Sequence, residues 1–172
     1  MIRIESESGG GEDFVAELMG QTEERAEMAV FDAIQHLRTK AIEKVSGQRS
    51  GRTYLVPGQR SATYQASNPG EPPAVATGKL RQNINAEGPN NDGSEISGKV
   101  GVDLRVVPYA RRLEYGGVHV QAKDQVFPTA DGFRRVRAGT VIRVAPRPWL
   151  RPTFDQERAA VERMMQRRLD RG

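Results

Sequence analysis

The sequence predicts an α+β domain: a long N-terminal helix and a C-terminal helix packed on a small antiparallel sheet, with a long Pro- and Gly-rich arm. Near both ends of the chain, apolar residues recur at three- and four-residue steps, the spacing of a helix with one buried stripe. In the middle they alternate with polar residues, the spacing of a strand. A length of 172 residues suits one domain, so we expect 1–172 to fold as a single α+β unit.

The first helix is expected over residues 12–46. Before it, Ile2 and Ile4 alternate with charged residues and indicate a short opening strand, which three consecutive glycines end. The apolar stripe of the helix consists of Phe14, Leu18, Ala26, Val30, Ala33, Leu37 and Ala41. Gly20 is expected to kink or break the helix and Gly47 to end it, because glycine commonly follows the last residue of a helix.

Residues 47–77 are rich in Gly, Ser, Pro, Gln and Asn and show no sustained apolar period, which predicts an extended loop or arm without regular elements. Ordered loops longer than about 15 residues within a compact domain tend to be functional. Tyr54, Tyr64, Pro69 and Glu71 are therefore candidate contacts with other subunits or partner proteins. The prolines near Glu71 also lower the entropy lost when such an arm docks.

Residues 78–146 are expected to hold the sheet with its hairpins and a short helix. The predicted elements are a helical turn at 77–80, an extended segment from 84, a strand at 96–104, a helix at 108–115 and at least two strands within 118–144. Turn residues lie at 90–93, 131–132 and 138–139. The alternation within 96–104 predicts that this strand buries one of its faces.

The closing helix is expected over residues 149–170. Its apolar face consists of Phe154, Val161, Met165 and Leu169. Thr153 and Gln156 have the spacing of a capping box at its start. Trp149, the only tryptophan, lies at the very start of this helix, between a proline and a leucine. We expect it to anchor either the core or a subunit interface, and we favour the core.

No constellation of catalytic or metal-binding residues is recognisable in the sequence. The chain has no cysteine, and His36 and His119 have no partner at a catalytic or metal-ligand spacing. We find no phosphate loop, nucleophile elbow or dinucleotide fingerprint. The prediction is a protein that is not an enzyme and uses no metal or cofactor. Because no apolar run reaches the length of a membrane span or forms a signal-peptide core, we expect no membrane partner.

Charge is distributed unevenly along the chain. Residues 1–50 hold 6 Lys/Arg against 10 Asp/Glu, whereas residues 103–172 hold 15 against 8, within a net charge of +4. A run of six arginines without any acidic residue starts with Arg134, Arg135 and Arg137, three candidate contact residues. These side chains could hold a DNA backbone, pair with the acidic first helix of a neighbouring copy, or remain solvated. The last two interpretations are favoured because aromatic residues that stack on bases are sparse here.

Four segments, in this order, resemble the neck, tail-completion or head-tail joining proteins of long-tailed bacteriophages. They are Pro-Gly-Glu-Pro-Pro-Ala followed by Thr-Gly-Lys-Leu within 67–80, Val-Gly-Val at 100–102, Pro-Tyr-Ala with Leu-Glu-Tyr-Gly within 108–116, and Arg-Pro-Trp-Leu-Arg-Pro-Thr-Phe-Asp at 147–155. With the charged first helix, the resemblance extends over residues 12–170. The segment 119–143 departs from it.

The resemblance implies a structural virion protein without a catalytic site, which forms a ring, commonly a hexamer, between the capsid portal assembly and the tail tube. The partners it implies are further copies of the chain, the neighbouring phage connector and tail proteins, and genomic DNA that passes through the channel without sequence-specific binding. The location it implies is the neck or tail of the virion, assembled in the cytoplasm of the bacterial host.

Two other functions agree with the same residues. A tail terminator, which caps the tail tube, belongs to the same class of structural proteins and would have the same fold. A small basic DNA-binding protein would explain the basic rear half of the chain. That alternative predicts salt-sensitive binding to duplex DNA by a monomer or dimer, whereas the first two functions predict rings.

Overall fold

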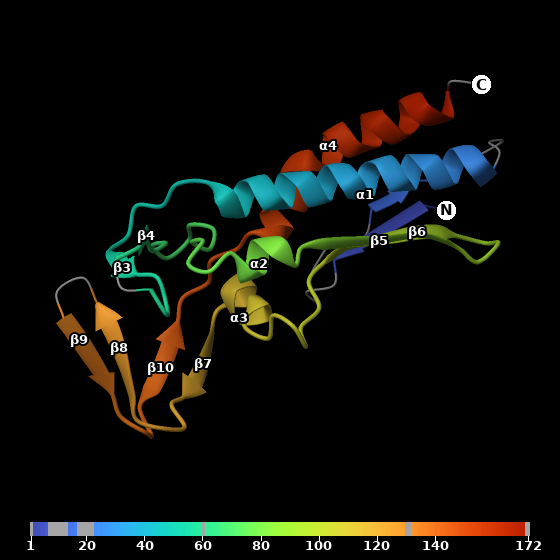
Figure 1. Cartoon of the computed structure of the whole chain (residues 1–172). Coiled ribbons are helices and arrows are strands. Elements are labelled where there is room, and N and C mark those ends of the chain that lie inside the picture. The colour runs from blue at the N-terminus through green and yellow to red at the C-terminus, as the bar shows by residue number, and fades with distance from the viewer. Residues whose placement is uncertain (1, 7–13, 17–22, 60, 130–131, 171–172) are drawn as a thin grey trace.

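The computed structural model describes residues 2–6, 14–16, 23–59, 61–129 and 132–170, and it confirms the α+β class (Figure 1). In chain order the elements are β1 (Ile2–Ser6), β2 (Phe14–Ala16), α1 (Glu23–Ser46), β3 (Thr53–Leu55), β4 (Thr63–Gln65), α2 (Lys79–Gln82), β5 (Asn85–Asn91), β6 (Ile96–Gly101), α3 (Ala110–Tyr115), β7 (Gly117–Val120), β8 (Gln125–Thr129), β9 (Gly132–Val136), β10 (Val141–Val144) and α4 (Leu150–Leu169).

The body of the molecule is layered: α4 packs on α1, and α1 packs on strands β5 and β6 of a four-stranded sheet (Figure 1). The strand order is β2-β1-β6-β5. β1 runs parallel to β6, and the other neighbours are antiparallel, so this sheet is mixed where an antiparallel one was expected. Because α1 lies between α4 and the sheet, its apolar residues pack against both.

Small and β-branched residues allow these layers to approach closely. The buried stripe of α1 consists of Ala26, Ala29, Val30, Ala33, Ile34, Leu37, Ala41 and Val45. Gly98 of β6 lies directly against it. A β-carbon at position 98 would be 2.7 Å from Cγ2 of Ile34 and 3.0 Å from Cγ1 of Val30, both below normal contact. Any larger side chain at this position would therefore force Ile34 and Val30 to shift.

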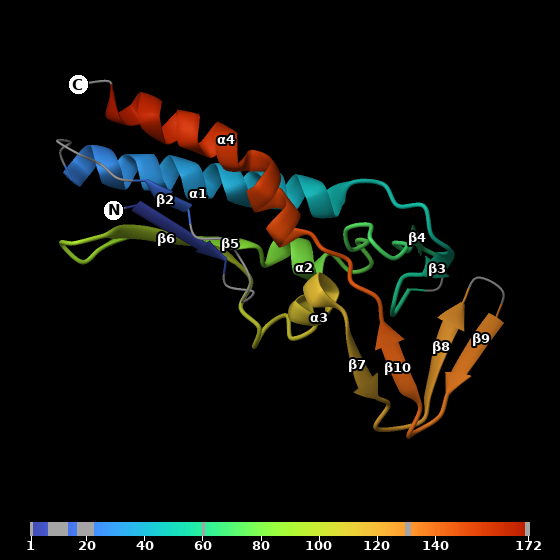
Figure 2. The same ribbon diagram turned by 180° about the vertical axis from the view of Figure 1, so that it is seen from behind.

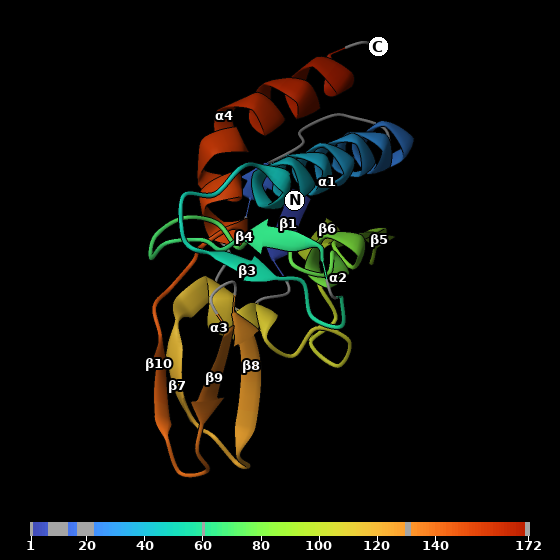
Figure 3. The ribbon, with the colours of Figure 1, turned by 60° about the vertical axis from the view of Figure 1, so that its left-hand side comes forward.

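The described residues of the segment 117–144 form a second structure, which projects from the body beyond α3 (Figures 1 and 3) and is named the folded-back hairpin here. β7 pairs with β10, and the pairing continues where the N–H of Gly139 donates to the carbonyl of Gln121 at 2.8 Å. Beyond this point β8 and β9 form another two-stranded ribbon. It turns back toward the body, where β8 lies beside β3 (Figure 2).

The first helix starts later than predicted. Phe14–Ala16 is a strand paired with β1, with Phe14 opposite Ile4, and α1 begins only at Glu23. Aromatic and β-branched residues favour strands, and here this preference outweighs the helical spacing. The predicted kink at Gly20 lies outside the described residues. The predicted end of the helix at Gly47 is confirmed, since the last residue of α1 is the preceding serine.

Two other expectations were wrong. The segment 47–77 is not free of regular elements, because β3 and β4 form a hairpin within it. The capping box at Thr153 does not exist: α4 already begins at Leu150, and the Thr153 hydroxyl donates to the carbonyl of Trp149 at 2.6 Å. Thr153 thus lies inside the helix, and its hydroxyl bonds back to the preceding turn instead of capping the N-terminus.

The central elements match the prediction with shifted boundaries. α2, β5, α3, β7 and β10 lie where they were expected. The strand predicted at 96–104 ends at Gly101, and its buried face is confirmed by Ile96 and Val100. The turn predicted at 90–93 lies slightly later, because β5 extends through Asn91 and the Asp92 carboxylate accepts hydrogen bonds from the next turn residues. Of the turn predicted at 131–132, only residue 132 is described.

Candidate interaction surfaces

The folded-back hairpin carries much of the exposed apolar surface of the described chain. Of eleven large hydrophobic side chains that are exposed, six belong to this segment: Val118, Val120, Val126, Phe127, Phe133 and Val141. Phe133 is the extreme case, with 82% of its surface exposed. Soluble monomers rarely expose several large apolar side chains together, and such surfaces commonly bind other proteins.

Asp124 holds the corner at which the hairpin turns back. Its carboxylate accepts a hydrogen bond from the backbone N–H of Ala138 at 2.9 Å and another from the guanidinium of Arg135 at 2.5 Å. Both bonds favour the ionised form, the backbone bond most, and they hold the pKa of Asp124 below its ordinary value. Arg135, predicted as a partner contact, therefore pairs within its own chain.

A cleft of about 730 Å³ separates the β3–β4 hairpin from the folded-back hairpin. Tyr54 and Tyr64 form one wall: they are directly opposite in the register of β3 and β4, with ring centroids 6.1 Å apart. Phe127 and Ile142 contribute apolar surface from the other side. Burial raises the pKa of Tyr64, so its hydroxyl stays neutral at physiological pH. The cleft is thus lined mainly by aromatic and aliphatic side chains.

Arg134 and Arg143 make the lining of this cleft positively charged. In the strand registers, Arg134 lies opposite Phe127 and Arg143 lies opposite Val118. Both side chains are exposed, and neither forms an ion pair with another described residue. A group that enters the cleft therefore meets an apolar surface beside two guanidinium groups that no described carboxylate engages and that can bind a carboxylate or phosphate.

The remaining arginines of the basic run have different surroundings. The guanidinium of Arg147 donates to the carbonyl of Ser67 at 3.3 Å and so ties the chain before α4 to the Pro-rich loop. Arg137 and Arg151 are exposed. The run that is continuous in sequence is thus divided in space, and only part of it lies at the cleft.

The Pro-rich loop is held by its own chain. The carboxylate of Glu71 accepts hydrogen bonds from the hydroxyl of Ser50 and from the backbone N–H of Asn68, the latter at 2.8 Å. These bonds, that of Ser50 foremost, lower the pKa of Glu71. Pro69 is exposed next to them. Glu71 therefore shapes the loop from within, which leaves Pro69 as the predicted contact that the loop presents to solvent.

Trp149 belongs to the core, where its exposed fraction is 0%, as the favoured alternative stated. The backbone at this point is held by Glu114 of α3, a carboxylate that is only 3% exposed. Its Oε2 accepts hydrogen bonds from the N–H groups of Trp149 at 2.8 Å and Leu150 at 3.0 Å, and its Oε1 accepts one from Arg151 at 2.8 Å. Glu114 thus caps the N-terminus of α4 from another helix.

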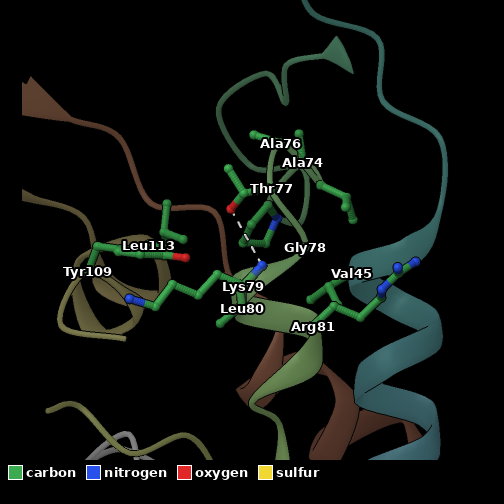
Figure 4. A pocket seen from close by; sticks show the side chains of 12 residues that line it. Val45, Ala74, Ala76, Thr77, Gly78, Lys79, Leu80, Arg81, Tyr109 and Leu113 are labelled. Carbon is green, nitrogen blue, oxygen red and sulfur yellow. Dashed lines mark hydrogen bonds between the residues drawn. The ribbon is translucent and has the colours of Figure 1, made fainter. Parts of the chain in front are cut away.

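A smaller cavity of about 240 Å³ lies where the end of α1 meets α2 and α3 (Figure 4). Val45 and Leu80 give it apolar walls, and the side chain of Lys79 extends from α2 toward α3 in Figure 4. Its titratable lining residues are Lys79, Arg81 and Tyr109, with neither a carboxylate nor an imidazole. This combination provides no acid and base pair that would act near neutral pH.

The two histidines lie in regular elements, His36 in α1 and His119 in β7. Nε2 of His36 lies 2.8 Å from Oε2 of Glu157 and joins α1 to α4. His119 lies in β7 opposite Ile142 of β10. Among the described residues, no three or more His, Asp or Glu side chains are grouped so that they could hold a metal ion. None of the helices in this part of the chain is both long and apolar enough to cross a membrane.

The start of α1 lies far from the folded-back hairpin, beside the end of α4 (Figure 1). Six acidic residues belong to this end, in α1 and in the turn after β5: Glu23, Glu24, Glu27, Asp32, Asp92 and Glu95. The arginines beside them are Arg25, Arg167 and Arg168, and Arg168 pairs with Asp32 at 3.5 Å. Glu27 accepts a hydrogen bond from the side chain of Asn91 at 3.0 Å, which holds the two segments together. Met28 and Phe31 of α1 are 40% and 42% exposed here.

Comparison with protein-family models, with curated proteins and with solved structures found no match.

The structure brings together three of the predicted contact residues, Tyr54, Tyr64 and Arg134, around one cleft. It places Pro69, Glu71 and Trp149 elsewhere, as described above. The roles of Glu114 and Phe133 were not predicted. Glu114 appears in the sequence only as part of the Leu-Glu-Tyr-Gly segment of a short charged helix, and Phe133 only as one aromatic residue beside a turn.

Proposed function

We propose that the protein is a structural virion subunit that assembles into a ring, commonly a hexamer in the proteins it resembles, at the head-to-tail connection of a long-tailed bacteriophage. The ring joins head to tail and leaves a channel for DNA. Its partners are further copies of the chain and the neighbouring connector and tail proteins. The ordered segments at 67–80, 100–102, 108–116 and 147–155 support this function by resemblance, and an α+β fold agrees with it.

The observation that carries an assembly role is the exposed apolar surface of the folded-back hairpin. Phe133 and Val118 expose 82% and 61% of their surfaces. Each Å² of apolar surface removed from water contributes about 25 cal/mol, so these residues stabilise the protein only once another chain covers them. None of the described hydrophobic residues of the folded-back hairpin belongs to the buried core, and a projecting ribbon of this kind suits a subunit that interlocks with its neighbours.

Native mass spectrometry at near-physiological ionic strength, followed by negative-stain imaging, tests the ring. One closed oligomer and particles with a central opening are expected. A protein that stays monomeric at micromolar concentration contradicts the proposal.

The position in the virion is tested by deleting the gene from a phage that encodes this chain. A joining protein should leave filled heads and separate tails of normal length. A tail terminator should instead leave overlong tubes, because nothing then caps the growing tail. Intact virions in the deletion strain would refute both locations.

Duplex DNA binding is a second candidate, favoured by the exposed guanidinium groups of Arg134, Arg137 and Arg143. It predicts a monomer or dimer whose DNA affinity falls steeply with salt, by about one power of the salt concentration per phosphate contact. Fluorescence anisotropy with a labelled duplex at several salt concentrations measures this slope. Tight binding by a monomer supports the second candidate over the first.

A further inference from the structure

The cleft between the two hairpins has a defined chemistry that no described residue of its own chain satisfies. Its walls are the rings of Tyr54, Tyr64 and Phe127, and it includes Arg134 and Arg143, which form no ion pair with a described residue. A matching occupant presents a large apolar side chain with a carboxylate next to it. This inference rests on the ring assembly proposed above, since it names the contact between neighbouring copies.

The chain itself presents such a surface on the first turns of α1. Met28 and Phe31 are 40% and 42% exposed. Glu24 lies four residues before Met28, and Glu27 lies four residues before Phe31. Residues four apart share a helix face, so each apolar side chain has a carboxylate beside it. We name Glu24, Glu27, Met28 and Phe31 the acidic knob.

The charges around the cleft and the knob are opposite. In the folded-back hairpin, the described charged residues are Lys123, Arg134, Arg135, Arg137 and Arg143 against Asp124 alone. The end of the molecule at the start of α1 has the reverse balance, with six acidic residues against Arg25, Arg167 and Arg168. Complementary potentials of this kind steer partners together and fix their orientation.

The cleft and the knob lie at opposite ends of the molecule (Figures 1 and 2). A single copy therefore cannot bring them together, and a contact between two copies leaves one cleft and one knob free. Contacts of this head-to-tail kind continue from copy to copy until a ring closes.

We propose that the cleft of one copy receives the acidic knob of a second copy, with Met28 and Phe31 against the aromatic wall and Glu24 and Glu27 facing Arg134 and Arg143. Each subunit then covers part of the exposed apolar surface of its neighbour. The contact is heterologous, so every copy in the ring uses both of its ends.

Charge reversal tests this pairing. In the Arg134→Glu/Arg143→Glu variant the cleft repels the wild-type knob, and in the Glu24→Lys/Glu27→Lys variant the knob repels the wild-type cleft. Each variant should lose rings, or weaken their assembly at least about tenfold, in native mass spectrometry. A chain that carries all four substitutions has its charges exchanged and should assemble again. A mixture of the two variants should also assemble, with alternating copies.

Arg81→Glu/Arg111→Glu is the matched control: it reverses two exposed arginines outside the cleft and should leave the rings intact. Circular dichroism and melting curves establish that every variant is folded. Rings that persist in both reversed variants, or a folded four-substitution chain that stays monomeric, overturn the pairing while the ring itself stands. A monomeric wild-type protein overturns the ring and the pairing together.

Discussion

Replacement of Glu114 tests whether one carboxylate fixes the start of α4. Its two oxygens accept three backbone N–H bonds, from Trp149, Leu150 and Arg151, at 2.8 to 3.0 Å. Glu114→Ala removes both acceptor oxygens and with them all three bonds. A buried donor left without a partner costs about 1–3 kcal/mol, and loss of the negative charge at the helix N-terminus adds up to about 2 kcal/mol. Because the Arg151 amide is only partly buried and water can reach it, we expect a total loss of about 3–5 kcal/mol.

Glu114→Gln keeps the size and shape of the side chain but removes its charge and one of its two acceptor oxygens. An amide oxygen at the Oε2 position still accepts from Trp149 and Leu150, but the amide NH₂ then faces the N–H of Arg151. One bond of three is lost, so we expect about 1–2 kcal/mol. The order of stability should be wild type, then glutamine, then alanine.

Urea unfolding followed by tryptophan fluorescence measures the free energy of unfolding of both variants with a probe at the start of α4. Trp149 is the only tryptophan, it is fully buried, and its backbone N–H is one of the three donors to Glu114. The comparison requires the same oligomeric state for all three proteins, because assembly adds to apparent stability. An alanine variant within about 0.5 kcal/mol of the wild type would show that the three bonds do not hold this junction.

Three further outcomes are expected. Gly98→Ala should lower the melting temperature and cost about 1–3 kcal/mol, because its β-carbon would lie 2.7 Å from Ile34; an unchanged melting curve would show that the layers yield without cost. Trp149→Ala should cost about 3–5 kcal/mol through the cavity it leaves in the core, and a melting curve like that of the wild type would refute this role. The lowered pKa of Asp124 predicts that the bonds at the hairpin corner stabilise the fold above the ordinary Asp pKa of about 3.9 and are lost as the pH falls through the lower folded value. Amide NMR shifts of the hairpin should show this acid-dependent step in the wild type, and an identical step in Asp124→Asn would contradict its assignment.

Local patterns predicted most of the helices and strands, because they depend on residues a few positions apart. Gly47 ends α1 and two glycines follow α3, as expected from the freedom of glycine at helix ends. The mistaken helix over Phe14 has a different cause. The apolar residues around Phe14 fit helical spacing. This segment forms a strand because it pairs with β1, which begins at residue 2, and the spacing of apolar residues does not show which segments pair.

The contacts that shape the candidate surfaces could not be predicted because they join distant residues. Glu114 caps a helix that starts 36 residues later. Asp124 reaches Ala138 across the corner of the hairpin. Periodicity also shows which residues share a face, but not whether anything covers that face. Val118 and Val120 alternate as buried strand residues do, yet they are 61% and 59% exposed.

The charge of Arg134 and Arg143 favours a protein contact over contact with DNA in the proposed channel. Each phosphate contact contributes about 0.9 to the slope of log affinity against log salt, and contacts from all copies in a ring would add. If Arg134 and Arg143 faced the channel of the proposed ring, about six copies would offer roughly a dozen guanidinium groups and would hold DNA too tightly for it to slide. At a subunit contact the same arginines meet carboxylates of the next copy and raise specificity instead. Salt should then dissociate the rings, while DNA affinity stays low at every salt concentration.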